Sequence, residues 1–378
     1  MKPGAVPSVF SWSKEKSLNA KQREERLMKR SMEKNKEPDF DRDIQVLEVV
    51  VENTVDMPEV PKDQEEELDH IESSSQTPSW SRISVADLRS NPKMLRYYTG
   101  LEHSAHFDYV LNTLGPAAHH LQYRWRKPTK PAVEDQFLMT LMKLRLHKSN
   151  IELSFLFDIS EYSVANIFVT WINFMYIRWR QINIFPSREL VKFYMPESFR
   201  QDFANTRLII DGMEVPIQKP SKPAAQQITY STYKNRNTLK TIIGITPGGL
   251  TSYIPDTHGG SASDRLLVER SNLTRICDPG DSIMCDKGFD VQDIFAPFDV
   301  AINVPTFMRK KNQLSNNEVL KDRKIASKRV HVERVIGLAK TYKILVSPMN
   351  DVETVLGSHI VFCCFMLCNM RPCIVPNN

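Results

Sequence analysis

The chain has 378 residues, of which 41% are hydrophobic and 25% are charged. This composition is typical of a globular protein, and at roughly 150 residues per domain the length predicts two or three domains. With only 13 glycines and no persistent heptad, collagen-like and coiled-coil architectures are excluded. The most apolar stretch, residues 360–367, is far shorter than the roughly 18 residues of a membrane-spanning helix, so we expect a buried helix there and no membrane partner.

The formal net charge of +5 is distributed unevenly along the chain. Residues 1–36 carry +6 and residues 37–72 carry −12, so the remainder carries +11. An excess of positive charge on the folded part suits an anionic partner such as DNA, although plain solubility explains it equally well.

Residues 1–84 are predicted to form a disordered, charged tail and linker. From residue 37 onward acidic residues, Ser and Pro dominate, and such a segment buries too little apolar surface to offset the entropy cost of ordering. No apolar run suggests a secretory leader, and the six cysteines, which lie between Cys277 and Cys373, lack zinc-site spacing. We therefore expect free, mostly buried thiols and an intracellular protein.

A helical domain is predicted for residues 85–200. Apolar residues between 95 and 114 recur at helical spacing and indicate one or two amphipathic helices, which Gly115 and Pro116 end. The loop that follows is basic and contains Arg124, Arg126, Lys127 and Lys130.

Within this domain, residues 135–179 have the layout of a helix-turn-helix. Helical spacing predicts helices at 135–146, at 150–157 with Asn150 as the N-cap, and from 161 to about 179 with Ser160 as the cap. In that geometry the start of the last helix enters the major groove. The candidate DNA-contacting residues are Glu161, Tyr162, Ser163 and Asn166. None of them is basic, so an ordinary helical bundle is the alternative.

Residues 201–378 alternate predicted strands and helices. The apolar run 208–210 ends in Asp211, and the apolar run 282–285 ends in Asp286. Two further strands flank a Pro-Gly-Gly turn at 247–249, which is a hairpin pattern. The remaining predicted elements are a helix at 261–271, a short helix at 291–295, a buried strand at 300–302 and a long basic helix at 318–340.

The acids of this region suggest a metal site. An Asp at the end of a buried strand is costly unless something stabilises its charge, and carboxylate oxygens suit Mg²⁺ or Mn²⁺. Two such ions, about 3.5–4 Å apart, drive in-line displacement at phosphodiesters. The alternative is that these aspartates cap turns. The long helix offers candidate DNA phosphate contacts at Lys321, Arg323, Lys324, Lys328, Arg329 and Arg334.

Four segments match one family of nucleases in their order along the chain. They are IDGMEV (210–215), YSTYKNRNTLK (230–240), DKGF (286–289) and RVHVERVIG (329–337). Over about 205–370 the chain resembles the DDE transposase/endonuclease domain of PIF/Harbinger-type elements, and residues 135–175 resemble the helix-turn-helix that precedes it. The resemblance implies an α/β fold with an RNase H-like catalytic domain at 201–378, after an all-α helix-turn-helix domain and the disordered tail.

The resemblance also assigns site residues. The family's two metal-binding aspartates fall on Asp211 and Asp286, and its glutamate falls on Glu333. Asp264 matches a further acid near the metals, and Arg329 matches a basic residue one helical turn before the glutamate.

Two positions depart from the family pattern. Met213 stands where Thr is common, and Leu338 stands where a basic residue is usual. Neither departure removes a metal ligand.

The resemblance implies a metal-dependent DNA endonuclease or transposase in the nucleus. Asp211, Asp286 and Glu333 would hold two divalent ions, and water and then a DNA 3′-hydroxyl would attack phosphate. A homo-oligomer is expected when the enzyme is active. The alternatives are a domesticated, non-catalytic DNA-binding or scaffold protein and, more distantly, an RNA-directed nuclease.

Residues 3–10 (PGAVPSVF) resemble the closing segment of the THAP zinc-finger domain. No Cys precedes Cys277, so this chain has no ligands for such a finger. Phosphate contacts carry no sequence information. We therefore expect the chain alone to bind duplex DNA with little sequence preference, so that specific targeting needs either a separate DNA-binding partner protein or the missing finger.

Overall fold

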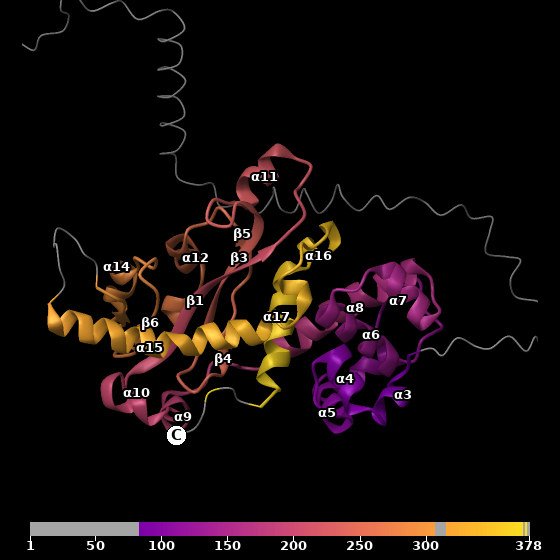
Figure 1. The fold of residues 1–378 in the computed structure, drawn as a ribbon, viewed down its shortest axis with the longest axis horizontal. Helices are drawn as coiled ribbons and strands as arrows, with labels where there is room; N and C mark the ends of the chain where they lie inside the picture. Colours follow the sequence, from indigo (N-terminus) through magenta and orange to yellow (C-terminus); the bar gives the residue numbers. More distant parts are fainter. Residues whose placement is uncertain (1–82, 307–314, 373–374, 376–378) are drawn as a thin grey trace, which may run out of the picture. The chain divides into compact units, whose positions relative to one another are not determined.

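The computed structural model describes residues 83–306, 315–372 and 375, and Figure 1 shows the fold. The THAP-like segment and the predicted tail and linker up to residue 82 lie outside the described residues. Within the described ranges, no helix is long and apolar enough to cross a membrane.

Three short helices open the described chain, and the last two of them confirm the one or two helices predicted between residues 95 and 114. They are α3 (Val85–Arg89), α4 (Pro92–Thr99) and α5 (Ser104–Thr113). Pro92 occupies the first turn of α4, where its missing N–H costs nothing. Gly100 ends α4 at φ +81°, a left-handed conformation that favours glycine. α5 ends just before Gly115 and Pro116, as predicted, and a 3₁₀ turn, η2 (Pro116–His120), follows.

The predicted helix-turn-helix layout is confirmed by α6 (Val133–Leu146), α7 (Asn150–Phe157) and α8 (Glu161–Arg180). Ser160 caps α8 as predicted, and its Oγ accepts from the Ser163 amide. The predicted cap of α7 is wrong, because Ser149 forms a capping box with Glu152 instead. The predicted apolar face of α8 is buried and comprises Val164, Ile167, Phe168, Trp171 and Ile172.

The C-terminal part is a mixed sheet flanked by helices. In the described chain the strand order is β2-β3-β1-β6-β7, with β4 and β5 also paired to β3. β1 runs antiparallel to β3 and parallel to β6, and β6 runs parallel to β7. The strands are β1 (Thr206–Pro216), β2 (Tyr230–Ser231), β3 (Arg236–Ile245), β4 (Thr251–Tyr253), β5 (His258–Gly259), β6 (Ser282–Met284) and β7 (Ala301–Asn303).

The strand predictions are largely confirmed. β3 and β4 form the predicted antiparallel hairpin, in which Gly249 has φ +89°. The prediction that the last strand is buried is wrong, because β7 lies at the sheet edge with Ala301 exposed. The accompanying helices are α9 (Arg188–Phe193), α10 (Glu197–Asp202), α11 (Pro223–Thr229), α12 (Asp264–Arg270), α13 (Leu273–Ile276), α14 (Gln292–Phe295), α15 (Asn316–Ala339), α16 (Asp351–Val355) and α17 (Gly357–Asn369), with 3₁₀ turns η3 (Ala296–Phe298) and η4 (Lys343–Leu345).

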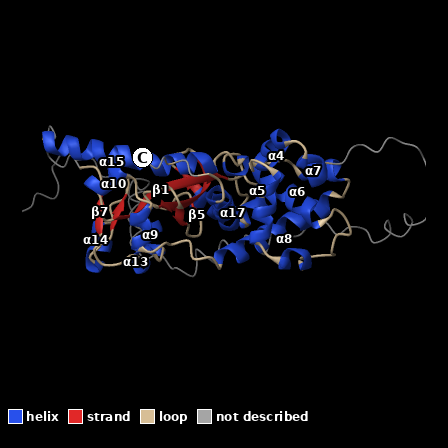
Figure 2. Ribbon diagram, turned by 90° about the horizontal axis from the view of Figure 1, so that it is seen from below, coloured by secondary structure: helices blue, strands red, loops and turns tan. Residues whose placement is uncertain are grey.

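Side chains alternate across β1 and so divide its core between two faces. Ile209 and Met213 belong to the cluster that includes α15 and α17. Leu208 and Ile210 belong to a second cluster with α12, α13 and α14. Figure 2 shows the strands between α15 on one side and α13 and α14 on the other. An odd-numbered residue of β1 near Ile209 therefore faces α15.

Helix α17 joins the sheet to the helical part. Its residues 360–368 are buried, which confirms the predicted core helix. On one side, His359 lies against α8, with its Nδ1 2.8 Å from Asn173 Oδ1. On the other side, Asn369 exchanges two hydrogen bonds with the Thr251 backbone on β4. One hydrophobic cluster therefore extends from α4 and α8 to the sheet.

The cysteine prediction is confirmed within the described residues. Five cysteines are free and buried there: Cys277, Cys285, Cys363, Cys364 and Cys368. Burial raises the pKa of the Cys277 and Cys285 thiols to about 12, so both are protonated at neutral pH. Cys373 lies outside the described residues.

Candidate active site

Two predicted site aspartates lie side by side because their strands are neighbours. In the parallel pairing of β1 with β6, Ile209 lies opposite Met284. Two residues farther along each chain come Asp211 and Asp286, at the carboxyl end of β6. The predicted strand end at Asp211 is wrong, since β1 continues beyond it and pairs that residue with Ile243.

The third acid comes from the helix that covers this face. Asp211 is an odd-numbered residue of β1, so it points toward α15 like Ile209 and Met213. Glu333 projects from α15, one turn after Arg329. Three separate elements thus contribute one carboxylate each, as the resemblance implied.

The guanidinium of Arg329 lies among the three carboxylates. Its Nη1 donates to Asp286 Oδ1 at 2.9 Å, and its Nη2 lies 4.0 Å from Asp211 Oδ1 and 4.0 Å from Glu333 Oε1. The Arg329 side chain is only 13% exposed. A single, nearly buried cation therefore faces three acids.

The pKa of Asp211 shows how the charges of this cluster add up. Burial raises the pKa of Asp211, and the charges of Asp286 and Glu333 raise it further. Arg329 and a hydrogen bond from the Gly212 amide act in the opposite direction but do not outweigh burial. The ionised Asp211 is thus incompletely compensated, and the cluster favours additional positive charge.

Asp264 lies on the other face of β1, next to the site but paired with a lysine. Its Oδ1 is 3.0 Å from Lys240 Nζ, and a Cβ at Gly212 would meet the same oxygen at 3.0 Å. Gly212 therefore leaves room for this carboxylate directly behind Asp211. Lys240 was not predicted as a site residue, although a basic residue within an apolar strand is a usable sign of a buried acidic partner.

The basic helix α15 presents only part of its predicted phosphate contacts to solvent. It begins at Asn316 behind a Ser315–Glu318 capping box. Two of the predicted phosphate-contacting lysines contact α10. Lys324 pairs with Asp202 at 2.5 Å, and the Lys328 ammonium lies 5.3 Å from the Phe199 ring centroid. Burial lowers the pKa of Lys328. The exposed predicted cations of α15 are Lys321, Arg323, Lys324 and Arg334, of which Lys324 is engaged by Asp202.

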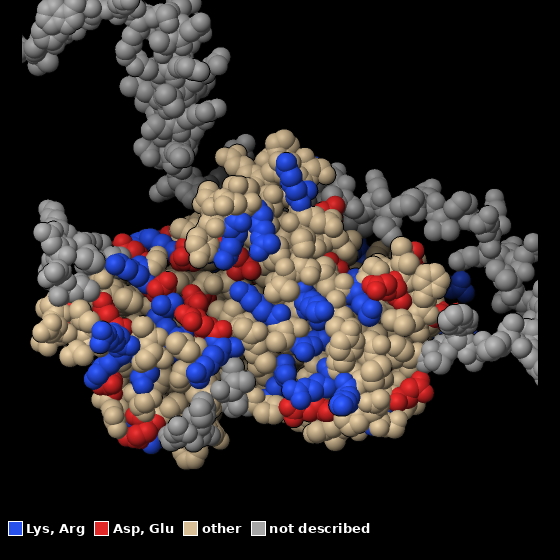
Figure 3. All heavy atoms as spheres, viewed as in Figure 1, with Lys and Arg blue, Asp and Glu red and all other residues tan. Residues whose placement is uncertain are grey.

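Acidic and basic side chains are interspersed over β1 and α15 on the face drawn in Figure 3. This mixture distinguishes the carboxylate cluster from a purely basic DNA-binding surface. The negative carboxylates would repel the phosphates of DNA. A positively charged ligand is therefore needed between them before DNA can approach closely.

The predicted DNA-contacting residues of α8 divide into two groups. Glu161 and Tyr162 are exposed, and Ser163 is half-buried. Asn166 is only 2% exposed, and its Nδ2 donates to the Arg126 carbonyl at 2.9 Å. The Asn166 side chain therefore does not reach the surface as predicted, because a loop from 40 residues earlier covers it.

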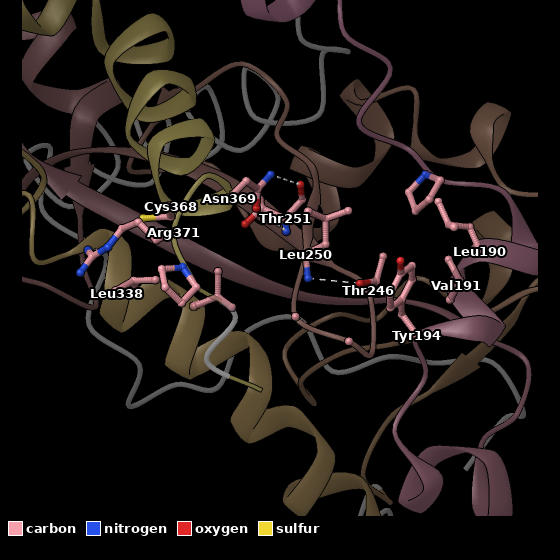
Figure 4. Close-up of a pocket in the computed structure, with 15 residues that line it drawn as sticks. Leu190, Val191, Tyr194, Thr246, Leu250, Thr251, Leu338, Cys368, Asn369 and Arg371 are labelled. Carbon is pink, nitrogen blue, oxygen red and sulfur yellow. Dashed lines mark hydrogen bonds between the residues drawn. The ribbon is translucent and has the colours of Figure 1, made fainter. Parts of the chain in front are cut away.

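A mostly apolar pocket of about 320 Å³ lies apart from the carboxylates (Figure 4). α9 contributes Leu190 and Val191, α15 contributes Leu338, and the end of α17 contributes Cys368. No acidic residue lines it in the described chain, so it cannot supply carboxylate ligands. Leu338, which stands where a basic residue is usual in the family, packs into this pocket.

The three carboxylates are suitable ligands for a hard divalent cation, but the Arg329 guanidinium occupies the space between them. Three carboxylates provide oxygen ligands of the kind that Mg²⁺ and Mn²⁺ prefer. Across the described ranges, however, no three Asp, Glu, His or Cys side chains lie close enough together to hold a metal ion as they stand. The residues fit the ion chemically, and binding requires them to exchange Arg329 for it.

Comparison with known families agrees with this geometry. Residues 210–369 match a family model described as DDE superfamily endonuclease, and residues 132–181 match one described as helix-turn-helix of DDE superfamily endonuclease. The first match contains all three acids and Arg329, and the second contains α6, α7 and α8. Neither the curated proteins nor the solved structures give a match.

Proposed function

Because this chain belongs to the DDE superfamily of transposases and endonucleases, with the family's helix-turn-helix before the endonuclease domain, we propose that it cleaves DNA phosphodiester bonds. The observation that carries the proposal is the convergence of Asp211, Asp286 and Glu333 on one nearly buried guanidinium. The strand order around β1, antiparallel on one side and parallel on the other, supports an RNase H-like catalytic domain.

Each residue has a role in this proposal. Two divalent cations, Mg²⁺ or Mn²⁺, would activate the attacking oxygen and stabilise the leaving one. Asp211 and Asp286 lie side by side and would both hold these ions, and Glu333 would complete the ligand set from α15. Arg329, once released from Asp286, is close enough to donate hydrogen bonds to a phosphate oxygen. Asp264 is assigned to orienting Lys240 behind the site.

DNA would lie along the exposed cations of α15, with the helix-turn-helix as a second contact. Lys321, Arg323 and Arg334 supply phosphate contacts. Lys324 and Lys328 instead hold α15 on α10 through Asp202 and Phe199. A nuclear location, a homo-oligomer and a separate targeting partner protein complete the proposal, and they rest on the family alone.

A non-catalytic DNA-binding protein that keeps the fold is the second candidate. The closed arrangement around Arg329 and the apolar Leu338 favour it. The deciding experiment is a nicking assay of the full chain on supercoiled DNA with Mg²⁺, with Mn²⁺ or with EDTA. Nicking that needs either ion supports the endonuclease. Binding of the plasmid without nicking under every condition would establish the second candidate.

Replacing Arg329 by Gln is expected to tighten Mn²⁺ binding in the absence of DNA. The guanidinium competes with a metal ion for Asp286, and the hydrogen bond to be broken is charge-assisted. Losing an interaction worth on the order of 1.5 kcal/mol corresponds to roughly a tenfold lower Kd for Mn²⁺. Isothermal titration calorimetry with MnCl₂ measures this change directly.

Arg334→Gln is the matched control for this variant. It removes the same charge from the same helix but at an exposed position, so the Kd for Mn²⁺ should change little. Equal tightening in both variants would reveal a general charge effect. An unchanged Kd in the Arg329 variant would show that the guanidinium does not oppose the ion.

A further inference from the structure

The loop before α6 brings positive charge to the part of the helix-turn-helix that lacks it. At the start of α8, Glu161, Tyr162 and Ser163 carry no cation. Residues 124–130 (RWRKPTK) contain four basic residues and no acid. All four basic residues are exposed: Arg124, Arg126, Lys127 and Lys130.

An aromatic contact places this loop beside α8. The ring centroids of Trp125 and Tyr162 are 5.4 Å apart, a distance typical of an aromatic pair. The Arg124 guanidinium lies 5.2 Å from the Trp125 centroid, within the range of a cation–π contact. Such stacking holds a guanidinium in a defined plane, with its N–H groups directed outward around the rim.

A buried hydrogen bond fixes the loop backbone to the same helix. Asn166 Nδ2 donates to the Arg126 carbonyl at 2.9 Å. Burying an amide is costly unless it is hydrogen-bonded, so this bond ties the loop backbone to α8 in one position. The cations are thus carried by a segment with two independent attachments, one aromatic and one polar.

We propose that residues 124–130, together with Tyr162, form a binding surface for the sugar-phosphate backbone of duplex DNA. Four cations within seven residues match the charge of successive phosphates, and arginine pairs with phosphate in a bidentate manner. The phenol of Tyr162 adds a neutral hydrogen-bond donor at the centre of the surface. This surface goes beyond the proposed cleavage and does not depend on metal or catalysis.

The surface also gives a reason why the first turn of α8 carries no cations. Backbone contacts fix the register of a DNA-binding helix, and the loop supplies them. Glu161, next to Tyr162, would be repelled by a nearby phosphate. Glu161→Gln should therefore tighten binding severalfold, an effect opposite in sign to that of the loop substitutions.

The test measures binding of the full chain to a mixed-sequence 20-bp duplex by fluorescence anisotropy in EDTA, from 50 to 200 mM salt. The loop variant carries two substitutions, Arg124→Gln and Lys127→Gln. Each lost phosphate contact lowers the slope of log affinity against log salt by about 0.9, so the slope should fall by about 1.8. Affinity at 100 mM salt should fall roughly tenfold.

The control variant is Lys93→Gln with Arg96→Gln, which removes two exposed cations from α4 in the same helical part. Its slope should stay near that of the unchanged protein. The proposal is overturned if the slope of the loop variant is unchanged, if both variants lose affinity equally, or if a 20-bp RNA duplex binds more tightly than the DNA. The single variants Arg124→Gln and Lys127→Gln repeat the test, each with an expected slope change of about 0.9.

These outcomes are separate from those of the nicking assay. Cleavage is absent in EDTA for any metal-dependent nuclease, so the binding data stand whether or not the chain cuts DNA. Tyr162→Ala extends the test to the aromatic contact. That variant should weaken binding with far-UV circular dichroism unchanged, since Tyr162 is exposed.

Discussion

Replacing Asp211, Asp286 or Glu333 singly by the corresponding amide is expected to lower metal-dependent nicking of supercoiled DNA by roughly a thousandfold or more. Each amide keeps the shape of the side chain but removes one anionic oxygen ligand. The loss should appear in the rate at saturating DNA, because DNA binding rests on basic residues elsewhere. Single-turnover nicking rates with Mg²⁺ and with Mn²⁺ measure the effect.

The same variants should remain folded, which separates a lost ligand from a lost structure. Burial raises the pKa of Asp211, so its ionised form is disfavoured in the folded protein. That penalty is present at neutral pH and disappears as pH falls below the unfolded pKa of about 3.9. Asp211→Asn should therefore melt at the same temperature as the parent, or higher, in EDTA at pH 7. Full nicking by any of the three variants would refute the assignment of these acids as metal ligands. Glu269→Gln, at an exposed position of α12, is the control.

Glu353→Ala is expected to destabilise the protein by about 3 kcal/mol or more. The Glu353 side chain is 2% exposed, and its carboxylate lies 3.0 Å from both Lys143 Nζ and His147 Nε2 on the helix-turn-helix side. Removing it leaves the buried Lys143 ammonium without its anionic partner. Urea denaturation followed by circular dichroism gives the change in unfolding free energy.

Acid should weaken the same contact. Burial raises the pKa of Glu353, but the His147 hydrogen bond and the Lys143 charge outweigh it and lower the pKa to about 2. A depressed pKa contributes stability above the unfolded value of about 4.3, and that stability is lost as pH falls from there toward 2. The difference in unfolding free energy between Glu353→Ala and the parent protein should therefore shrink as pH falls through this range. Glu269→Ala, which breaks an exposed pair with Arg265, should lower the unfolding free energy by less than about 0.5 kcal/mol. An equal loss in the two variants would show that the buried pair of Glu353 contributes no more than this exposed one.

Local patterns in the sequence predicted the helix-turn-helix and the strands that lead to Asp211 and Asp286, whereas Glu333 was assigned by the family resemblance. Helical spacing and Ser160 defined α8, and apolar runs located the strands that carry Asp211 and Asp286. The length of β1 was underestimated because Gly212 and Glu214 interrupt the apolar run. Their alternation with Met213 and Val215 is the two-residue period of a strand buried on one face.

Long-range contacts were not predictable from local patterns. Asn166 lies at a position of α8 that spacing allows to be exposed, and only the loop at Arg126 buries it. Similarly, helical spacing places Arg329 one turn before Glu333 but does not show that its guanidinium reaches Asp286. The side-chain partner in each case comes from another element, 40 or more residues away.

The position of α17 has a consequence for how the protein is made. This helix packs on α8 through His359 and on β4 through Asn369, so both parts of the fold need it to complete their cores. A nascent chain acquires α17 only after residues 357–369 have left the ribosome. The helix-turn-helix, although synthesised earlier, must wait for this helix to reach its final stability. A message cut short before this helix would yield a chain with both cores incomplete and apolar surface exposed, which chaperones and proteases recognise.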